Sequence, residues 1–139
     1  MEAAHRDHPR SIGRSIGAVL AGIVVAIVLT LAADVLMHAI GVYPALGQPI
    51  GSKPLLLATA YRIVFGVVGG SVTARLAPYD PMKHSLAGGV FGTIAGIAGA
   101  LATWNKGLGP HWYAVAVIVI ALPSAWLGAK LRLRQISPS

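Results

Sequence analysis

The sequence predicts an all-α fold, an integral membrane four-helix bundle with both termini on the cytoplasmic side. Hydrophobic residues make up 55% of the 139 residues and charged residues 11%, and the mean hydropathy is +0.72. A soluble domain carries about a quarter charged residues. Because this chain has too few charges to cover a polar surface, most of its surface must face lipid. Four apolar stretches, each of the roughly 20 residues needed to cross a bilayer, set the number of helices.

The first expected span covers about residues 15–40 and follows a short basic segment. Its apolar run is long for a signal peptide, so we interpret it as a retained span and not as a cleaved leader. Gly and Pro residues within 41–53 end this helix and make the longest connection between spans. The second span is expected over about 54–76, with Pro54 at its start.

The third span is expected over about 82–104, after a tight turn. Asp80 is the expected N-cap of this helix and Pro81 its first helical residue. The fourth span, over about 110–130, also opens with a proline. Together the four spans are expected to form one membrane domain over residues 1–139.

Lys and Arg residues set the orientation, because loops that stay in the cytoplasm carry an excess of them. One side of the expected bundle carries eight of these cations: Arg6, Arg10, Arg14, Arg75, Lys83, Lys130, Arg132 and Arg134. The other side carries only Lys53 and Lys106, so both termini are expected in the cytoplasm. Aromatic residues agree, since four fall at the outer interface: Tyr43, Trp104, Trp112 and Tyr113.

Asp34 and Arg62 are the candidate polar centre of the protein. The chain has four acidic residues, and the other three belong to cytoplasmic segments. Asp34 is therefore the one carboxylate that Arg62 can meet in the outer half of the membrane. An arginine at the centre of the membrane costs about 3 kcal/mol on insertion scales, which a carboxylate partner offsets. We expect an intramembrane ion pair, while a headgroup contact or a partner's acid remain alternatives for Arg62.

A polar rim is expected around this pair at the outer side, formed by His38, Tyr61, Asn105 and His111. Asp34, His38 and His111 are candidate metal ligands, although the chain contains no dense ligand motif. His38 and His111 are also candidate axial ligands of a haem. The alternative to metal or haem ligation is that these histidines lie at the membrane interface and bind no ligand. The sequence implies no cofactor, and a haem or a pigment stays open.

Small residues predict how the helices pack, because close approach of backbones drives helix association in lipid. The expected packing glycines lie on the second and third spans: Gly66, Gly69, Gly70, Gly88, Gly92, Gly96 and Gly99. They either pack the four helices on one another or dock the bundle onto another membrane subunit or a flat pigment.

Four segments carry a resemblance to a known group of proteins: residues 60–62, 69–78, 103–107 and 110–113. On these motifs the chain resembles a group of small, uncharacterised bacterial four-span integral membrane proteins. The resemblance implies the bacterial cytoplasmic (inner) membrane and brings no assigned activity.

Several function classes lose support from the sequence. There is no cysteine, so thiolate metal sites and disulfides are excluded. No phosphate loop, nucleophile elbow or paired carboxylates are present, so enzyme activity is uncertain and disfavoured. The charge of +7 fits lipid headgroups and topology better than nucleic acid.

The sequence therefore favours a non-catalytic accessory or structural subunit, which packs onto a larger membrane complex or onto itself. Its expected partners are the lipid bilayer and a membrane protein or a second copy. The alternative is a small transporter or channel with a polar site around Asp34, His38 and Arg62.

Overall fold

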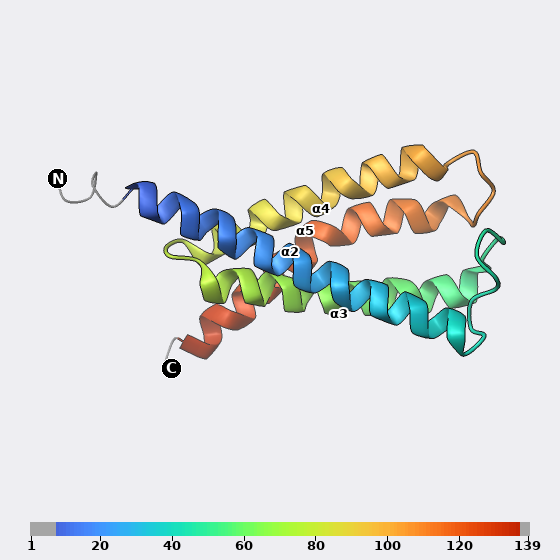
Figure 1. Cartoon of the computed structure of the whole chain (residues 1–139), viewed down its shortest axis with the longest axis horizontal. Helices are drawn as coiled ribbons and strands as arrows, with labels where there is room; N and C mark the ends of the chain where they lie inside the picture. The colour runs from blue at the N-terminus through green and yellow to red at the C-terminus, as the bar shows by residue number, and fades with distance from the viewer. Residues whose placement is uncertain (1–7, 137–139) are drawn as a thin grey trace.

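The computed structural model describes residues 8–136, which form four α-helices and no strand (Figure 1). All four are long and apolar enough to cross a membrane, which confirms the predicted all-α four-helix fold and fits a small integral membrane protein. The helices are α2 (His8–Ala39), α3 (Ser52–Leu76), α4 (Pro81–Thr103) and α5 (His111–Ile136). Arg6 lies outside the described residues.

The helices extend beyond the apolar stretches from which the spans were predicted. The differences are largest at the start of α2, which begins at His8 before the expected start at 15, and at the end of α5, which continues to Ile136 past the expected end at 130. Residues such as Lys130 and Arg132 are good helix formers, so hydrogen bonding continues where the apolar sequence stops. The apolar run marks the part of a helix that suits lipid and does not mark the end of the helix.

Asp80 differs from its expected role as a capping side chain. It occupies the N-cap position of α4, but with φ of +39°, and its side chain makes no capping hydrogen bond within the described chain. Its carboxylate instead lies 3.7 Å from the ammonium of Lys83, one turn along the same helix. The Asp80 carbonyl accepts hydrogen bonds from the backbone and the ring of His84.

The four helices form two hairpins, α2–α3 and α4–α5, joined along α3 and α5. Helices α3 and α5 pack on each other at the centre, α2 covers α3, α4 covers α5, and α2 contacts α4 only to a small extent. The start of α2, the turn 77–80 and the end of α5 share one end of the bundle, here the terminal end (Figure 1). The connections 40–51 and 104–110 share the other, here the loop end, where α2 and α4 have separated.

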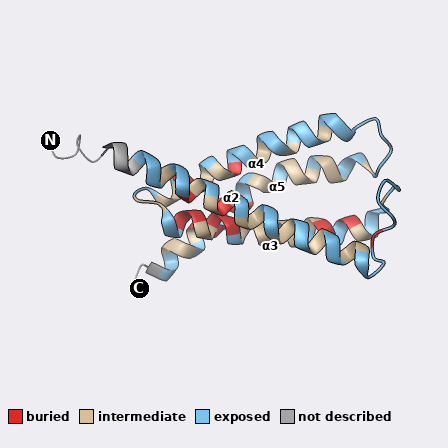
Figure 2. Ribbon diagram, viewed as in Figure 1, coloured by how far each residue is buried: buried red, intermediate tan, exposed pale blue. Residues whose placement is uncertain are grey.

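Small residues allow the closest packing near the terminal end, where most buried residues gather (Figure 2). A Cβ at Gly70 would lie 2.6 Å from the carbonyl oxygen of Ala125, and a Cβ at Gly128 would overlap the backbone of α3. The buried hydroxyl of Ser85 shares its one hydrogen between the carbonyls of Ala125 and Gly70, at 2.7 and 3.3 Å. One side chain of α4 thus bridges α3 and α5.

The expected packing glycines do not all have neighbours in the structure. A Cβ would meet another helix within 3.5 Å at Gly66, Gly69, Gly70, Gly92 and Gly96. At Gly88 the nearest atom is 4.0 Å away, and at Gly99 no described residue lies within 4 Å. Within the described bundle Gly88 therefore has only a distant neighbour, Val19 of α2, and Gly99 has none.

Candidate functional site

An ion pair between α2 and α3 forms the centre of the candidate site. Arg62 Nη2 donates a hydrogen bond of 3.2 Å to Asp34 Oδ2. The two side chains are 29% and 26% exposed, so the pair is neither in open solvent nor sealed inside the bundle. The structure thus brings together the two residues that the sequence assigned to an intramembrane ion pair.

Three tyrosine hydroxyls extend this pair into a chain of hydrogen bonds. The hydroxyl of Tyr61 donates to Asp34 Oδ1. Because tyrosine has one hydroxyl hydrogen, Tyr61 must accept the 2.5 Å bond that joins it to the hydroxyl of Tyr43. Arg62 Nε donates to the hydroxyl of Tyr113 over 2.5 Å. We call these five residues the polar cluster, which joins α2, α3, α5 and the loop after α2.

The turn after α2 brings Tyr43 back onto α3. Gly41 has φ of +82°, which side-chain-bearing residues rarely adopt, and this reverses the chain at the helix end. The amides of Val42 and Tyr43 then both donate to the carbonyl of Met37, at 2.9 and 3.1 Å. Tyr43 is buried against Leu55 of α3, with its hydroxyl directed at Tyr61.

The polar cluster neutralises its own charges. Both oxygens of Asp34 accept hydrogen bonds, and the guanidinium of Arg62 lies 5.8 Å from the centre of the Tyr113 ring. A cation within about 6 Å of an aromatic ring is attracted to its face. These contacts replace water around two charges that are costly to hold in lipid.

Tyr43 and Tyr113 belong to the polar cluster, although the sequence placed them only at the outer membrane interface. The signal available was chemical, since a tyrosine hydroxyl near lipid needs a hydrogen-bond partner and Arg62 offers five N–H donors. Their meeting depends on the turn at Gly41 and on the packing of α5 against α3. Neither can be read from residue spacing.

The expected polar rim is only partly assembled. Tyr61 belongs to the polar cluster, while Asn105 lies exposed in the turn before α5. The ring of His38 bonds the Asp34 carbonyl at 2.8 Å and packs edge-on against Tyr43, at 5.2 Å between centres. His111 stacks on Trp104 with ring centres 3.9 Å apart.

The candidate metal ligands do not form a metal site. Within the described residues no three His, Asp or Glu side chains are grouped so that they could hold a metal ion. Two cavities are described below, and Asp34 lines the second of them, whereas neither His38 nor His111 lines either one. The structure therefore does not assemble the proposed set of Asp34, His38 and His111, nor a cavity shared by the two histidines.

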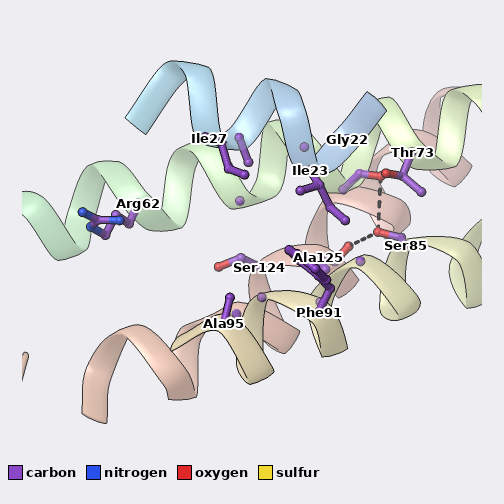
Figure 3. Close-up of a pocket in the computed structure, with 18 of the residues that line it drawn as sticks. Gly22, Ile23, Ile27, Arg62, Thr73, Ser85, Phe91, Ala95, Ser124 and Ala125 are labelled. Carbon is purple, nitrogen blue, oxygen red and sulfur yellow. Dashed lines mark hydrogen bonds between the residues drawn. The ribbon is translucent and has the colours of Figure 1, made fainter. Parts of the chain in front are cut away.

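A groove of about 220 Å³ runs between α2 and α4, with α3 and α5 as its floor. Figure 3 shows Arg62 at one end of it and Thr73 and Ser85 at the other. Its lining is mostly Gly, Ala and aliphatic side chains, among them Ile23, Ile27, Gly66, Gly92, Ala95 and Ala121, and it includes the aromatic ring of Phe91.

A second cavity of about 260 Å³, here the outer cavity, adjoins the groove. Both are lined by Ala26, Ile27, Thr30 and Arg62, and the outer cavity adds Leu31 and Asp34. The apolar groove therefore leads along the bundle to the Asp34–Arg62 pair. Such an arrangement suits binding of an amphiphile or of another helix better than bond-making chemistry.

Neither a family model, nor a curated protein, nor a solved structure matches the chain.

Proposed function

We propose that this protein is a non-catalytic structural or accessory subunit of the bacterial cytoplasmic membrane. The observation that supports this best is the hydrogen-bonded ion pair at the centre of the polar cluster. Among the described residues, Asp34–Arg62 is the one ion pair that joins two helices. Each of its two charged groups makes two hydrogen bonds to neighbouring side chains, so the pair and its tyrosine partners hold helices together.

The outer surface of α2 supports a role in assembly. Helix α2 packs mainly against α3, so one side of it is covered and the rest faces outward. Along the outward-facing side, a row of large apolar side chains is about half exposed or more: Ile16, Leu20, Val24, Leu31 and Val35. Apolar surface of this extent contacts lipid or a transmembrane partner.

Photo-crosslinking from α2 tests the subunit proposal. We expect a crosslinker at Val24 to join the chain to one defined membrane protein or to a second copy of itself. The yield of this crosslinked product should rise with the amount of that partner. A crosslinker at Val119 on α5, which is exposed to 63%, is the matched control. Equal capture of unrelated proteins at both positions, with a monomer in mild detergent, would contradict the proposal.

The second candidate is a small transporter with its site around Asp34, His38 and Arg62. It is favoured by the two adjoining cavities that reach Asp34 and Arg62. In that case purified protein in liposomes would show a solute flux that Asp34→Asn abolishes and Asp80→Asn leaves unchanged. Flux at the level of empty liposomes would remove this candidate.

The proposed orientation places both termini in the cytoplasm. Six cations of the described chain support it at the terminal end: Arg14, Arg75, Lys83, Lys130, Arg132 and Arg134. Because the chain has no cysteine, single cysteines report the side directly. In intact cells an impermeant maleimide should label Lys106→Cys and spare Lys83→Cys until the membrane is opened. The reverse pattern would invert the topology.

A further inference from the structure

We propose that the groove and the outer cavity together bind one zwitterionic phospholipid of the surrounding bilayer. An acyl chain lies along the groove between α2 and α4, the phosphate contacts Arg62, and the headgroup ammonium faces Asp34. This site does not depend on the proposed role as a subunit.

The groove has the size and lining of an acyl-chain site. Its volume is about 220 Å³, and its floor and walls include Gly66, Gly92, Ala121 and Ile27. An apolar cavity of about 150 Å³ inside a protein stays dry and takes up small apolar molecules. A groove between transmembrane helices meets acyl chains at every point along its opening, so these are its available apolar ligands.

Arg62 has hydrogen-bonding capacity left for a phosphate. A guanidinium has five N–H donors, and in the described chain Arg62 uses Nε for Tyr113 and Nη2 for Asp34. The Nη1 hydrogens remain for another acceptor, and Arg62 lines both cavities. Planar guanidinium groups pair well with phosphate oxygens.

Asp34 makes the charge pattern dipolar and not simply positive. Its carboxylate lines the outer cavity beside Arg62, and a carboxylate offers about four lone-pair positions for donors. A phosphoethanolamine group carries one negative and one positive charge at neighbouring positions, which matches this pair. An anionic headgroup without an ammonium would face Asp34 unpaired, so the site should prefer the zwitterion.

The depth of the guanidinium is compatible with a headgroup. Its partners lie close to the loop ends of their helices, Asp34 five residues before the end of α2 and Tyr113 two residues after the start of α5. At about 1.5 Å per residue these are distances of about 8 and 3 Å along the helices. The long side chain of Arg62 therefore carries its charge from within α3 towards the membrane surface.

Lipid binding to the purified full chain tests this proposal. The protein is stripped of lipid in detergent, then titrated with dioleoyl phosphatidylethanolamine, dioleoyl phosphatidylglycerol or dioleoylglycerol, and bound lipid is counted by native mass spectrometry. We expect one phosphatidylethanolamine per chain and about tenfold weaker binding of the other two, a factor that corresponds to about 1.4 kcal/mol.

Two alanines of α4 provide a matched pair of variants. Ala95 lines the groove, whereas Ala98 is exposed on the same helix and does not line it. Ala95→Trp should reduce phosphatidylethanolamine binding at least tenfold, while Ala98→Trp should stay within about twofold of the parent. Arg62→Gln should remove the preference over dioleoylglycerol; if this variant does not fold, the Ala95 pair still decides.

Three results would overturn the proposal. Equal binding by the parent and Ala95→Trp would show that the lipid lies outside the groove. Equal binding of phosphatidylglycerol would refute the pairing with Asp34. A dimer that excludes lipid and crosslinks through Phe91, which lines the groove, would make a second copy the occupant.

Discussion

The strength of the Asp34–Arg62 pair can be predicted from its geometry and measured with a double-mutant cycle. At 3.2 Å the Coulomb attraction is about 5 kcal/mol for an effective dielectric constant of 20. Both side chains are about a quarter exposed, and each gives up hydration to form the pair. We therefore expect a coupling free energy of about 2 kcal/mol, which lies between the coupling energies of exposed ion pairs and those of buried ion pairs.

The cycle uses Asp34→Asn, Arg62→Gln and the double variant, with unfolding free energies measured by steric trapping in lipid-like micelles. Each single variant should lose about 3 kcal/mol, because it leaves one charge near lipid without its partner. The double variant should lose about 4 kcal/mol, less than the sum by the coupling energy.

The Asp80–Lys83 pair serves as the internal control for this cycle. It is separated by 3.7 Å on one helix, and its side chains are 56% and 81% exposed. Exposed pairs of this spacing couple by about 0.5 kcal/mol or less. If the Asp34–Arg62 coupling does not exceed that of the control pair, the polar cluster does not hold α2 to α3 and the reasoning fails.

Three further changes probe the packing around the two hairpins. Gly128→Ala should destabilise the bundle by at least about 2 kcal/mol in the same unfolding assay, because its Cβ would overlap the α3 backbone. Gly99→Ala is the control and should be neutral or stabilising, since no described residue lies near its Cβ. Similar losses of stability in the two variants would refute the idea that Gly128 is a close-packing position. Ser85→Ala should cost about 1 kcal/mol, since the hydroxyl hydrogen that links α4 to carbonyls of α3 and α5 is lost, and an unchanged stability would remove the proposed bridge. Tyr113→Phe should cost about 1 kcal/mol alone and much less in an Arg62→Gln background; equal costs in both would show that the two groups act independently.

The sequence predicted the helices well because lipid imposes a simple rule. Each span must satisfy its backbone internally and present apolar side chains, so composition and proline positions are sufficient. Counting charges likewise pointed from Arg62 to Asp34, since other acidic residues were assigned to the far side. Neither prediction depends on how the helices pack against one another.

The rest of the site depends on tertiary geometry. Tyr43 reaches Tyr61 through a helix end reversed at Gly41, and Tyr113 reaches Arg62 because α5 packs beside α3. Gly128 was missed because nothing in its spacing separates it from any other glycine, and its contact is made by the facing backbone. A stripe of small residues predicts that contacts exist and does not say which helix supplies the partner.

The position of these contacts explains why the groove exists at all. Helix α2 is held at two places, both on α3: at Gly22, where a Cβ would strike Gly69 and Thr73, and at the pair of Asp34 with Arg62. Helix α4 is held on α5, and no comparable clamp joins α2 to α4 in the described chain. The floor between them consists of glycines and alanines that are too short to fill the space. An apolar gap therefore persists beside a fixed pair of charges, and closing it would require breaking contacts that the two hairpins already make.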